Sequence, residues 1–152
     1  MFWESVKLNF DEIINKYASD ILNDLDFKKQ TKYMQHKNVS VYSHVLNVAR
    51  YSLKMVNKFN INIDTKSLIR GCLLHDYFLY DWHENDPSHR LHGFTHASRA
   101  LKNANKVFDL NDIEKNMIYT HMFPLNLRLP KYKESIILCI SDKICAIKEI
   151  IR

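Results

Sequence analysis

Apolar residues recur at steps of three and four along most of this chain, the spacing that places them on one face of a helix. Such stretches cover residues 10–25, 45–59, 65–73, 97–108 and 113–118, and a last one starts near residue 131. Only two glycines and three prolines occur among 152 residues, too few for the many tight turns of an all-β fold. The sequence therefore predicts an all-α fold, a single bundle of about six helices.

The length of the chain suits one hydrophobic core, and no repeat, low-complexity tract or linker divides it. We therefore expect one domain over residues 1–152. Three segments are predicted to be irregular: residues 26–40, which are polar and lack periodicity, residues 81–95, which are rich in histidine, and the connection between Pro124 and Pro130.

The formal net charge of +5 comes from basic residues interleaved with acidic ones, without a Lys/Arg block. We therefore expect no nucleic-acid polymer as a partner, whereas a small anionic substrate suits a modest positive excess. Cys72, Cys139 and Cys145 lie in apolar stretches and lack zinc-site spacing, which indicates core residues. Neither a signal-peptide pattern nor a run of about 18 apolar residues occurs, so we expect a cytoplasmic protein without a membrane partner. The oligomeric state is left open.

Ionisable side chains fall on predicted helix faces that are otherwise apolar. His75 and Asp76 continue the stripe of the third helix, His121 follows the stripe of the fifth, and Asp142 lies on that of the last. Each alone has an ordinary explanation, such as a hydrogen-bonded core histidine or a surface ion pair. Together they favour a bound cation, because a buried carboxylate is costly unless it is paired or binds a metal. Imidazole and carboxylate suit iron, manganese, zinc or a similar ion.

The order of these residues resembles a known family. His44, the adjacent pair His75 and Asp76, and then Asp142 form the pattern H, HD, D, which resembles the HD superfamily of metal-dependent phosphohydrolases. The segments HGFTHASRAL (92–101) and YTHM (119–122) are similar to the additional histidine segments of binuclear members. The resemblance covers about residues 41–147. The branch that hydrolyses symmetrical dinucleoside tetraphosphates has similar ligand spacing, whereas the Gly-Tyr-Pro motif of the cyclic dinucleotide branch does not occur in the sequence.

This resemblance implies two divalent metal ions. The first ion would be held by four side chains: His44, His75, Asp76 and Asp142. The second would be held by His92 and His121, with Asp76 bridging the two ions. Iron is the expected metal, and manganese, zinc, nickel, cobalt and magnesium are the alternatives. The implied reaction is the hydrolysis of a phosphate ester or anhydride in a nucleotide or related small metabolite, through a metal-activated hydroxide.

Three residues are predicted to take part in catalysis: Asp76, His96 and Lys143. His96 stands where the family pattern has a small residue, and it lies one helical turn after His92, so we expect it to face the same site. Lys143, with Arg99 as a further candidate, would neutralise phosphate oxygens, although both also suit exposed helix positions. Three other histidines are candidates for proton transfer or substrate contact, or else exposed loop residues: His36, His83 and His89.

Two other functions fit the same ligand pattern. One is that of the HD-type di-iron oxygenases, which activate dioxygen and cleave carbon bonds. The other is a non-catalytic module that senses nucleotides or is stabilised by its metal. Ligand spacing does not separate these functions from hydrolysis, and the choice of substrate rests with variable loops.

Overall fold

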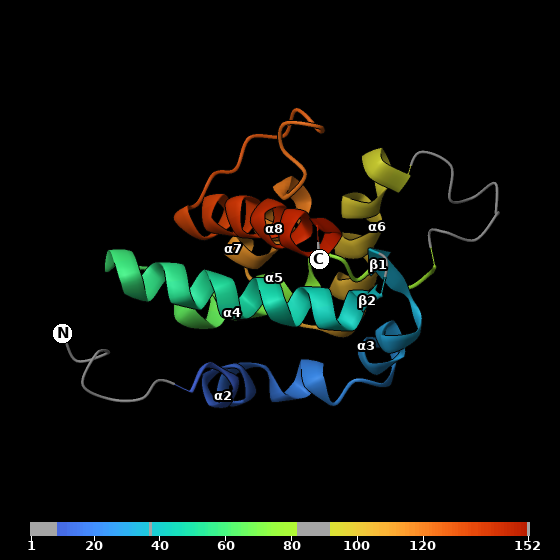
Figure 1. The fold of residues 1–152 in the computed structure, drawn as a ribbon, viewed down its shortest axis with the longest axis horizontal. Coiled ribbons are helices and arrows are strands. Elements are labelled where there is room, and N and C mark those ends of the chain that lie inside the picture. Colours follow the sequence, from blue (N-terminus) through green and yellow to red (C-terminus); the bar gives the residue numbers. More distant parts are fainter. Residues whose placement is uncertain (1–8, 37, 82–91, 152) are drawn as a thin grey trace.

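The described part of the chain is mostly helical (Figure 1). The computed structural model describes residues 9–36, 38–81 and 92–151. Its α-helices within these ranges are α2 (Phe10–Leu22), α3 (Leu25–Lys29), α4 (Val41–Phe59), α5 (Thr65–Leu74), α6 (His92–Val107), α7 (Asp112–Thr120) and α8 (Lys133–Ile151). A 3₁₀ turn (Gln30–Lys32) and an antiparallel ribbon of β1 (Met34–His36) and β2 (Val39–Ser40) lie between α3 and α4. The prediction of an all-α fold is confirmed.

Polar side chains fix where four of the helices begin. Each accepts a hydrogen bond from a backbone N–H in the first turn of α2, α4, α5 or α7: Asn9, Ser40, Asp64 and Asn111. These bonds satisfy backbone donors that have no partner inside the helix.

Helix α5 lies in the middle of the bundle, where it contacts α2, α4, α7 and α8. Residues 67–74 are all buried, which accounts for the apolar run along this helix. A Cβ atom at Gly71 would collide with the side chain of Met117 in α7. The glycine therefore lets α5 and α7 approach closely, and this packing brings the residues that follow the two helices near one another.

Two segments predicted to be irregular contain regular structure. Residues 26–40 include most of α3, the 3₁₀ turn and the ribbon. The prediction of a loop over residues 81–95 is wrong for its last four residues, because α6 begins at His92. Gly93 does not prevent this start, since one glycine in a helix costs only about 1 kcal/mol relative to alanine.

Several predicted helix boundaries are shifted, and α4 begins at Val41, four residues before the predicted stretch. The first helix ends at Leu22, because Asp24 caps the separate helix α3, and the last begins at Lys133. The third ends at Leu74, with His75 as its C-cap residue. His75 and Asp76 therefore lie on a turn, where two consecutive side chains can face one centre. Consecutive positions inside a helix do not face each other.

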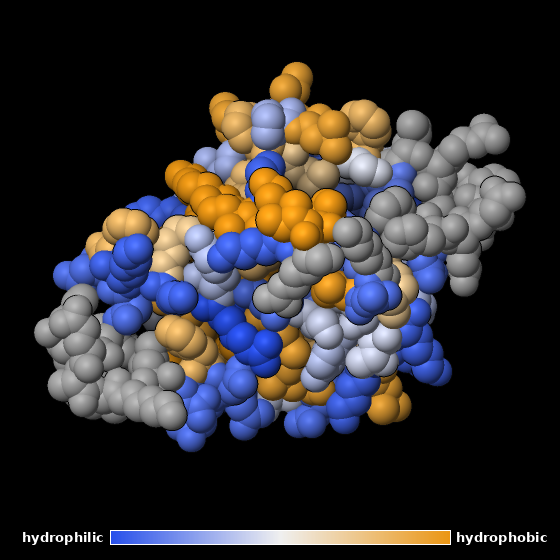
Figure 2. Space-filling model, viewed as in Figure 1, coloured by the Kyte–Doolittle hydropathy of each residue, from blue (hydrophilic) through white to orange (hydrophobic). Residues whose placement is uncertain are grey.

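Part of the surface is apolar. Figure 2 shows hydrophobic surface over α8 and the segment that precedes it. The exposed residues there include Ile136, Ile140 and Ile147, which are 48%, 45% and 59% exposed, and Leu127, which is 87% exposed. None of the described helices combines the length and the hydrophobicity that a membrane-spanning segment requires.

Candidate metal centre

Six buried side chains from five parts of the fold meet beside α5. They come from α4, the turn after α5, α6, the C-cap of α7, and α8: His44, His75, Asp76, His96, His121 and Asp142. Their possible ligand atoms form two groups that share Asp76. One group is completed by His44, His75 and Asp142, the other by His96 and His121, and within each group the atoms lie within 4.8 Å of one another.

The two oxygens of Asp76 face different groups. Oδ2 lies 3.3 Å from Nε2 of His75 and 3.6 Å from Nε2 of His44. Oδ1 lies 3.4 Å from Nε2 of His96 and 3.4 Å from Nε2 of His121. Asp76 is thus placed to give one oxygen to each of two neighbouring cations.

The other ring nitrogen of each histidine is held by a hydrogen bond. Three Nδ1–H groups donate to backbone carbonyl oxygens: His75 to Cys72 at 2.6 Å, His96 to His92 at 2.8 Å, and His121 to Ile118 at 2.7 Å. The carbonyls of Cys72 and Ile118 lie in the last turns of α5 and α7, where carbonyl groups lack partners within the helix. Because carbonyl oxygens only accept, Nδ1 carries the proton and a neutral ring offers its Nε2 lone pair to the centre.

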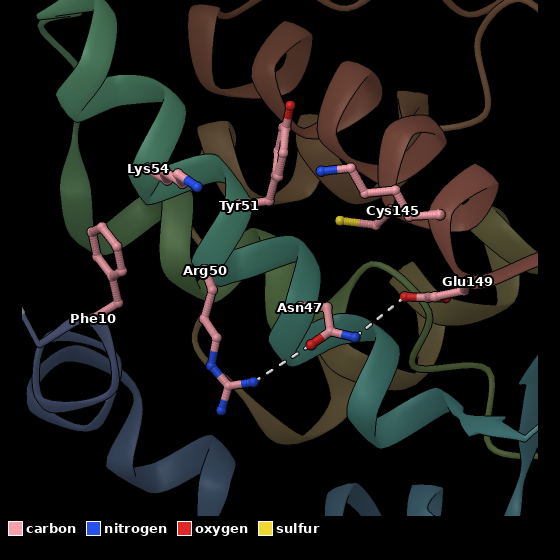
Figure 3. Close-up of a pocket in the computed structure, with 8 residues that line it drawn as sticks. Phe10, Asn47, Arg50, Tyr51, Lys54, Cys145 and Glu149 are labelled. Carbon is pink, nitrogen blue, oxygen red and sulfur yellow. Dashed lines mark hydrogen bonds between the residues drawn. The ribbon is translucent and has the colours of Figure 1, made fainter. Parts of the chain in front are cut away.

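The fourth histidine is held by a carboxylate. Nδ1 of His44 lies 2.8 Å from Oε1 of Glu149, a buried residue of α8. Figure 3 shows the far side of this contact, where the amide of Asn47 points to Glu149 and Nδ2 donates to Oε2 at 3.4 Å. Asn47 and Glu149 line a groove of about 260 Å³ between α4 and α8, and Arg50 also lines it. A carboxylate behind a histidine is a common support for a metal ligand.

The donor set fits divalent cations. Ligand atoms about 2.0 to 2.2 Å from a shared ion lie about 3 to 3.5 Å apart, as most of the nitrogen–oxygen pairs here do. Nε2 of His75 is buried without a hydrogen-bond partner. Nε2 of His96 and Nε2 of His121 lie 3.0 Å apart, a distance that requires either a proton shared between the rings or a cation bound by both.

The pKa values of the buried aspartates and histidines show that the carboxylates of the centre are ionised. Burial would raise the pKa of Asp142, but the charge of His75 and a hydrogen bond from His44 hold it well below its ordinary value. Burial would lower the pKa of His44, but hydrogen bonds to two carboxylates raise it to about 9. The pKa of Asp76 is also lowered, against burial, by the charge of His75 and a hydrogen bond from His121. The positive charge that keeps both carboxylates ionised comes from the protonated rings of His44 and His75, and bound cations would take the place of those protons.

A cavity of about 280 Å³ opens onto this centre. Asp76, His96 and Asp142 lie in its wall together with Lys143, His92 and two residues of β1, Gln35 and His36. The side chain of Lys143 is half-buried, and its Nζ donates to the carbonyl oxygen of His121 at 3.2 Å. The cavity therefore combines the possible metal ligands with one ammonium group.

The other predicted site residues lie around this cavity. His92 belongs to neither ligand group: its ring stacks on His96 with 4.6 Å between centroids, and Nδ1 lies 2.6 Å from the hydroxyl of Tyr80. His36 joins His44 and Glu149 in a third group of possible ligands. The guanidinium of Arg99 lies 5.3 Å from the ring centroid of Tyr80. His83 and His89 are outside the described residues.

Sequence reasoning missed two residues of the centre. Glu149 follows Asp142 by seven residues, which places both on one helix face, so its position was a usable signal. Gln35 donates a hydrogen bond from Nε2 to Oδ2 of Asp76 at 3.1 Å. Nothing in the local pattern marks Gln35, because it lies in a segment without periodicity.

Comparison with known proteins identifies the family. The model of the HD domain matches residues 41–147, more than half of the chain. No curated protein and no solved structure matches significantly. HD domains are all-α and typical of metal-dependent hydrolases. The matched range includes all six buried residues of the centre, and the chain belongs to the HD domain family.

Proposed function

We propose that this protein is a metal-dependent phosphohydrolase that cleaves a phosphate ester or anhydride bond in a nucleotide or a related small metabolite. One observation carries the proposal. Four imidazole Nε2 atoms converge on two buried carboxylates, each with Nδ1 held from behind, and the two oxygens of Asp76 face different groups. This donor set suits a pair of divalent cations, with iron expected and manganese, zinc, nickel, cobalt or magnesium as alternatives.

The proposed first cation is bound by four side chains: His44, His75, Asp76 and Asp142. For the second, Asp76 and His121 are joined by either His96 or His92. The contacts favour His96, because its Nε2 lies 3.4 Å from Asp76 and 3.0 Å from Nε2 of His121. His92 then lies behind His96, and its backbone carbonyl accepts the proton on Nδ1 of that ring.

When bound, such a pair of cations polarises a phosphoryl group and lowers the pKa of a water molecule. The protein's own groups orient the substrate. Lys143 lies in the cavity wall, and its ammonium is proposed to donate to a phosphate oxygen in place of its present contacts with the carbonyl oxygens of His121 and Cys139 and with Sγ of Cys139.

The proposed substrate class is set by the size and charge of the cavity. About 280 Å³ accommodates a phosphate group with part of the group attached to it, and the rest of the substrate would extend outside. Within this class, symmetrical dinucleoside tetraphosphates come first in a screen, because the ligand spacing resembles that of the branch that hydrolyses them. Nucleoside monophosphates and sugar phosphates follow.

A screen of these substrates tests the proposal. Protein loaded with Fe(II) or Mn(II) is expected to release phosphate or a nucleotide at equal rates with and without oxygen. Turnover that requires and consumes dioxygen would contradict the proposed hydrolysis and would identify an oxygenase instead. Tight metal and nucleotide binding without turnover of any substrate would instead favour a sensing module.

A further inference from the structure

The ribbon before α4 brings a polar side chain into the candidate metal centre. Gln35 lies in β1, outside residues 41–147 that match the HD domain, yet its amide contacts Asp76 across 41 positions of the chain. Strand β1 also contacts α4 and α8, which carry His44 and Asp142. The centre thus includes a residue that the family match does not supply.

Local geometry explains how Gln35 reaches the centre. In the ribbon, Met34 is paired with Ser40 and His36 with Val39, so β1 advances by two residues where β2 advances by one. Gln35 is the additional residue. A bulge of this kind locally redirects a side chain that regular pairing would direct elsewhere. Its neighbour His36 lines the same cavity, although consecutive side chains of a regular strand point to opposite faces.

The contact fixes the orientation of the shared carboxylate. Nε2 of Gln35 donates to Oδ2 of Asp76, the oxygen that faces His44 and His75. The terminal torsion of an aspartate is soft, so without support both oxygens can turn toward one cation. A donor on Oδ2 opposes that rotation and keeps Oδ1 directed to His96 and His121. As a neutral amide, Gln35 does so without cancelling the negative charge of Asp76.

We propose that Gln35 is a positioning residue for the metal centre, which orients the carboxylate of Asp76 so that each oxygen serves one cation. This inference rests on the proposed metal-dependent function. Metal ligands are commonly held by such neighbouring groups, and loss of one costs about 10- to 100-fold in metal affinity or activity.

Two substitutions at one position separate hydrogen bonding from packing. Gln35→Leu removes the donor, and Gln35→Glu keeps the shape but presents an acceptor to Asp76. Both are expected to weaken Mn²⁺ binding by about 10-fold or more in titrations of the full chain. The control is Gln30→Leu, because Gln30 is buried in the adjacent 3₁₀ turn and the described contacts do not link it to the centre. Melting of each chelated variant checks that it is folded.

Wild-type affinity for Mn²⁺ in either folded Gln35 variant overturns the positioning role. Tight binding by Gln35→Glu alone would assign Gln35 to packing, and tight binding by Gln35→Leu alone would show that its N–H is dispensable. The titration requires no substrate, so its result stands even if no phosphate compound is hydrolysed. On a substrate that the wild type does hydrolyse, kcat of both variants is expected to fall while KM changes little.

Discussion

At the residue scale, the pattern of histidines and aspartates predicted the centre without deciding every member of it. The adjacent pair His75 and Asp76 on an apolar stripe predicted a buried cation site, and the structure places both in one buried group of possible ligands. His92 and His96 lie one helical turn apart, so periodicity places both on one face of α6. Which ring reaches Asp76 depends on where α6 begins and how it packs on α7, and local sequence does not determine either.

The assignment of the second cation is tested by two matched substitutions. His96→Ala is expected to reduce the metal content from two ions per chain to one, because His96 lies beside Asp76 and His121. His92→Ala is expected to retain two ions, since His92 belongs to neither ligand group. Elemental analysis of both purified proteins provides the measurement. Loss of one ion by His92→Ala but not by His96→Ala would show that His92 is the ligand. One ion per chain in the wild type would mean a mononuclear centre.

Glu149 is expected to tune the first cation through His44. Glu149→Gln keeps the shape of the side chain but removes the negative charge beside Nδ1 of His44. We expect about 10-fold weaker metal binding, because the carboxylate makes the imidazole a stronger ligand. Competition with a chelating dye measures the affinity. Glu12→Gln, on the exposed face of α2, is the control for a change in net charge, and equal effects of the two substitutions would argue against the support role.

At the element scale, helix existence followed from periodicity, whereas boundaries and the ribbon did not. The helix over residues 45–59 was predicted to its C-terminal end, which Asn60 follows with a φ of 52°, but it begins one turn earlier than its apolar stripe, at Val41. The ribbon of β1 and β2 escaped prediction because it is short and is held largely by contacts with α4 and α8. Its contribution to the centre, Gln35, was missed for the same reason.

An ion pair between α2 and α5 is expected to make the stability of the protein depend on pH. Arg70 of α5 is 6% exposed and makes two hydrogen bonds to Asp20 of α2, at 2.6 and 2.9 Å. The hydrogen bond from Arg70 lowers the pKa of Asp20 below 3.8, so its stabilising contribution is present above that pH and is lost as the pH falls through the lower folded value. Asp20→Asn should therefore lower the melting temperature by a few degrees at pH 7 and by progressively less toward pH 3.

Thermal melts of this variant across pH are compared with those of Asp26→Asn. Asp26 forms a 3.4 Å ion pair with Lys29, but both side chains are about half-exposed or more, so its loss should change stability little. A difference between Asp20→Asn and wild type that does not shrink with acid would contradict the role of the ionised carboxylate.

At the scale of the whole molecule, the centre and the fold are expected to depend on each other. Four imidazoles and two carboxylates lie buried at the meeting point of α4, α5, α6, α7 and α8, so cations bound there would hold these elements together. Chelation should lower the melting temperature, and adding back metal should restore it. One domain over residues 1–152 stays a prediction, and it leads us to expect one cooperative transition in each state. A melting temperature unaffected by chelators would mean that the cluster does not bind metal in the folded protein.

Hydrolysis by metal-loaded protein with and without Asp76 tests the central claim most directly. Asp76 is the residue shared by both ligand groups, so Asp76→Ala should lose metal and reduce turnover by at least about 100-fold, beyond the usual effect of removing a supporting residue. The measurement is phosphate or nucleotide release, with bound metal determined in the same samples. We predict metal-dependent release by the wild type and none above background by the folded variant. Substantial hydrolysis by a folded Asp76→Ala protein, or equal hydrolysis by chelated wild type, would contradict a metal-dependent phosphohydrolase built on this centre.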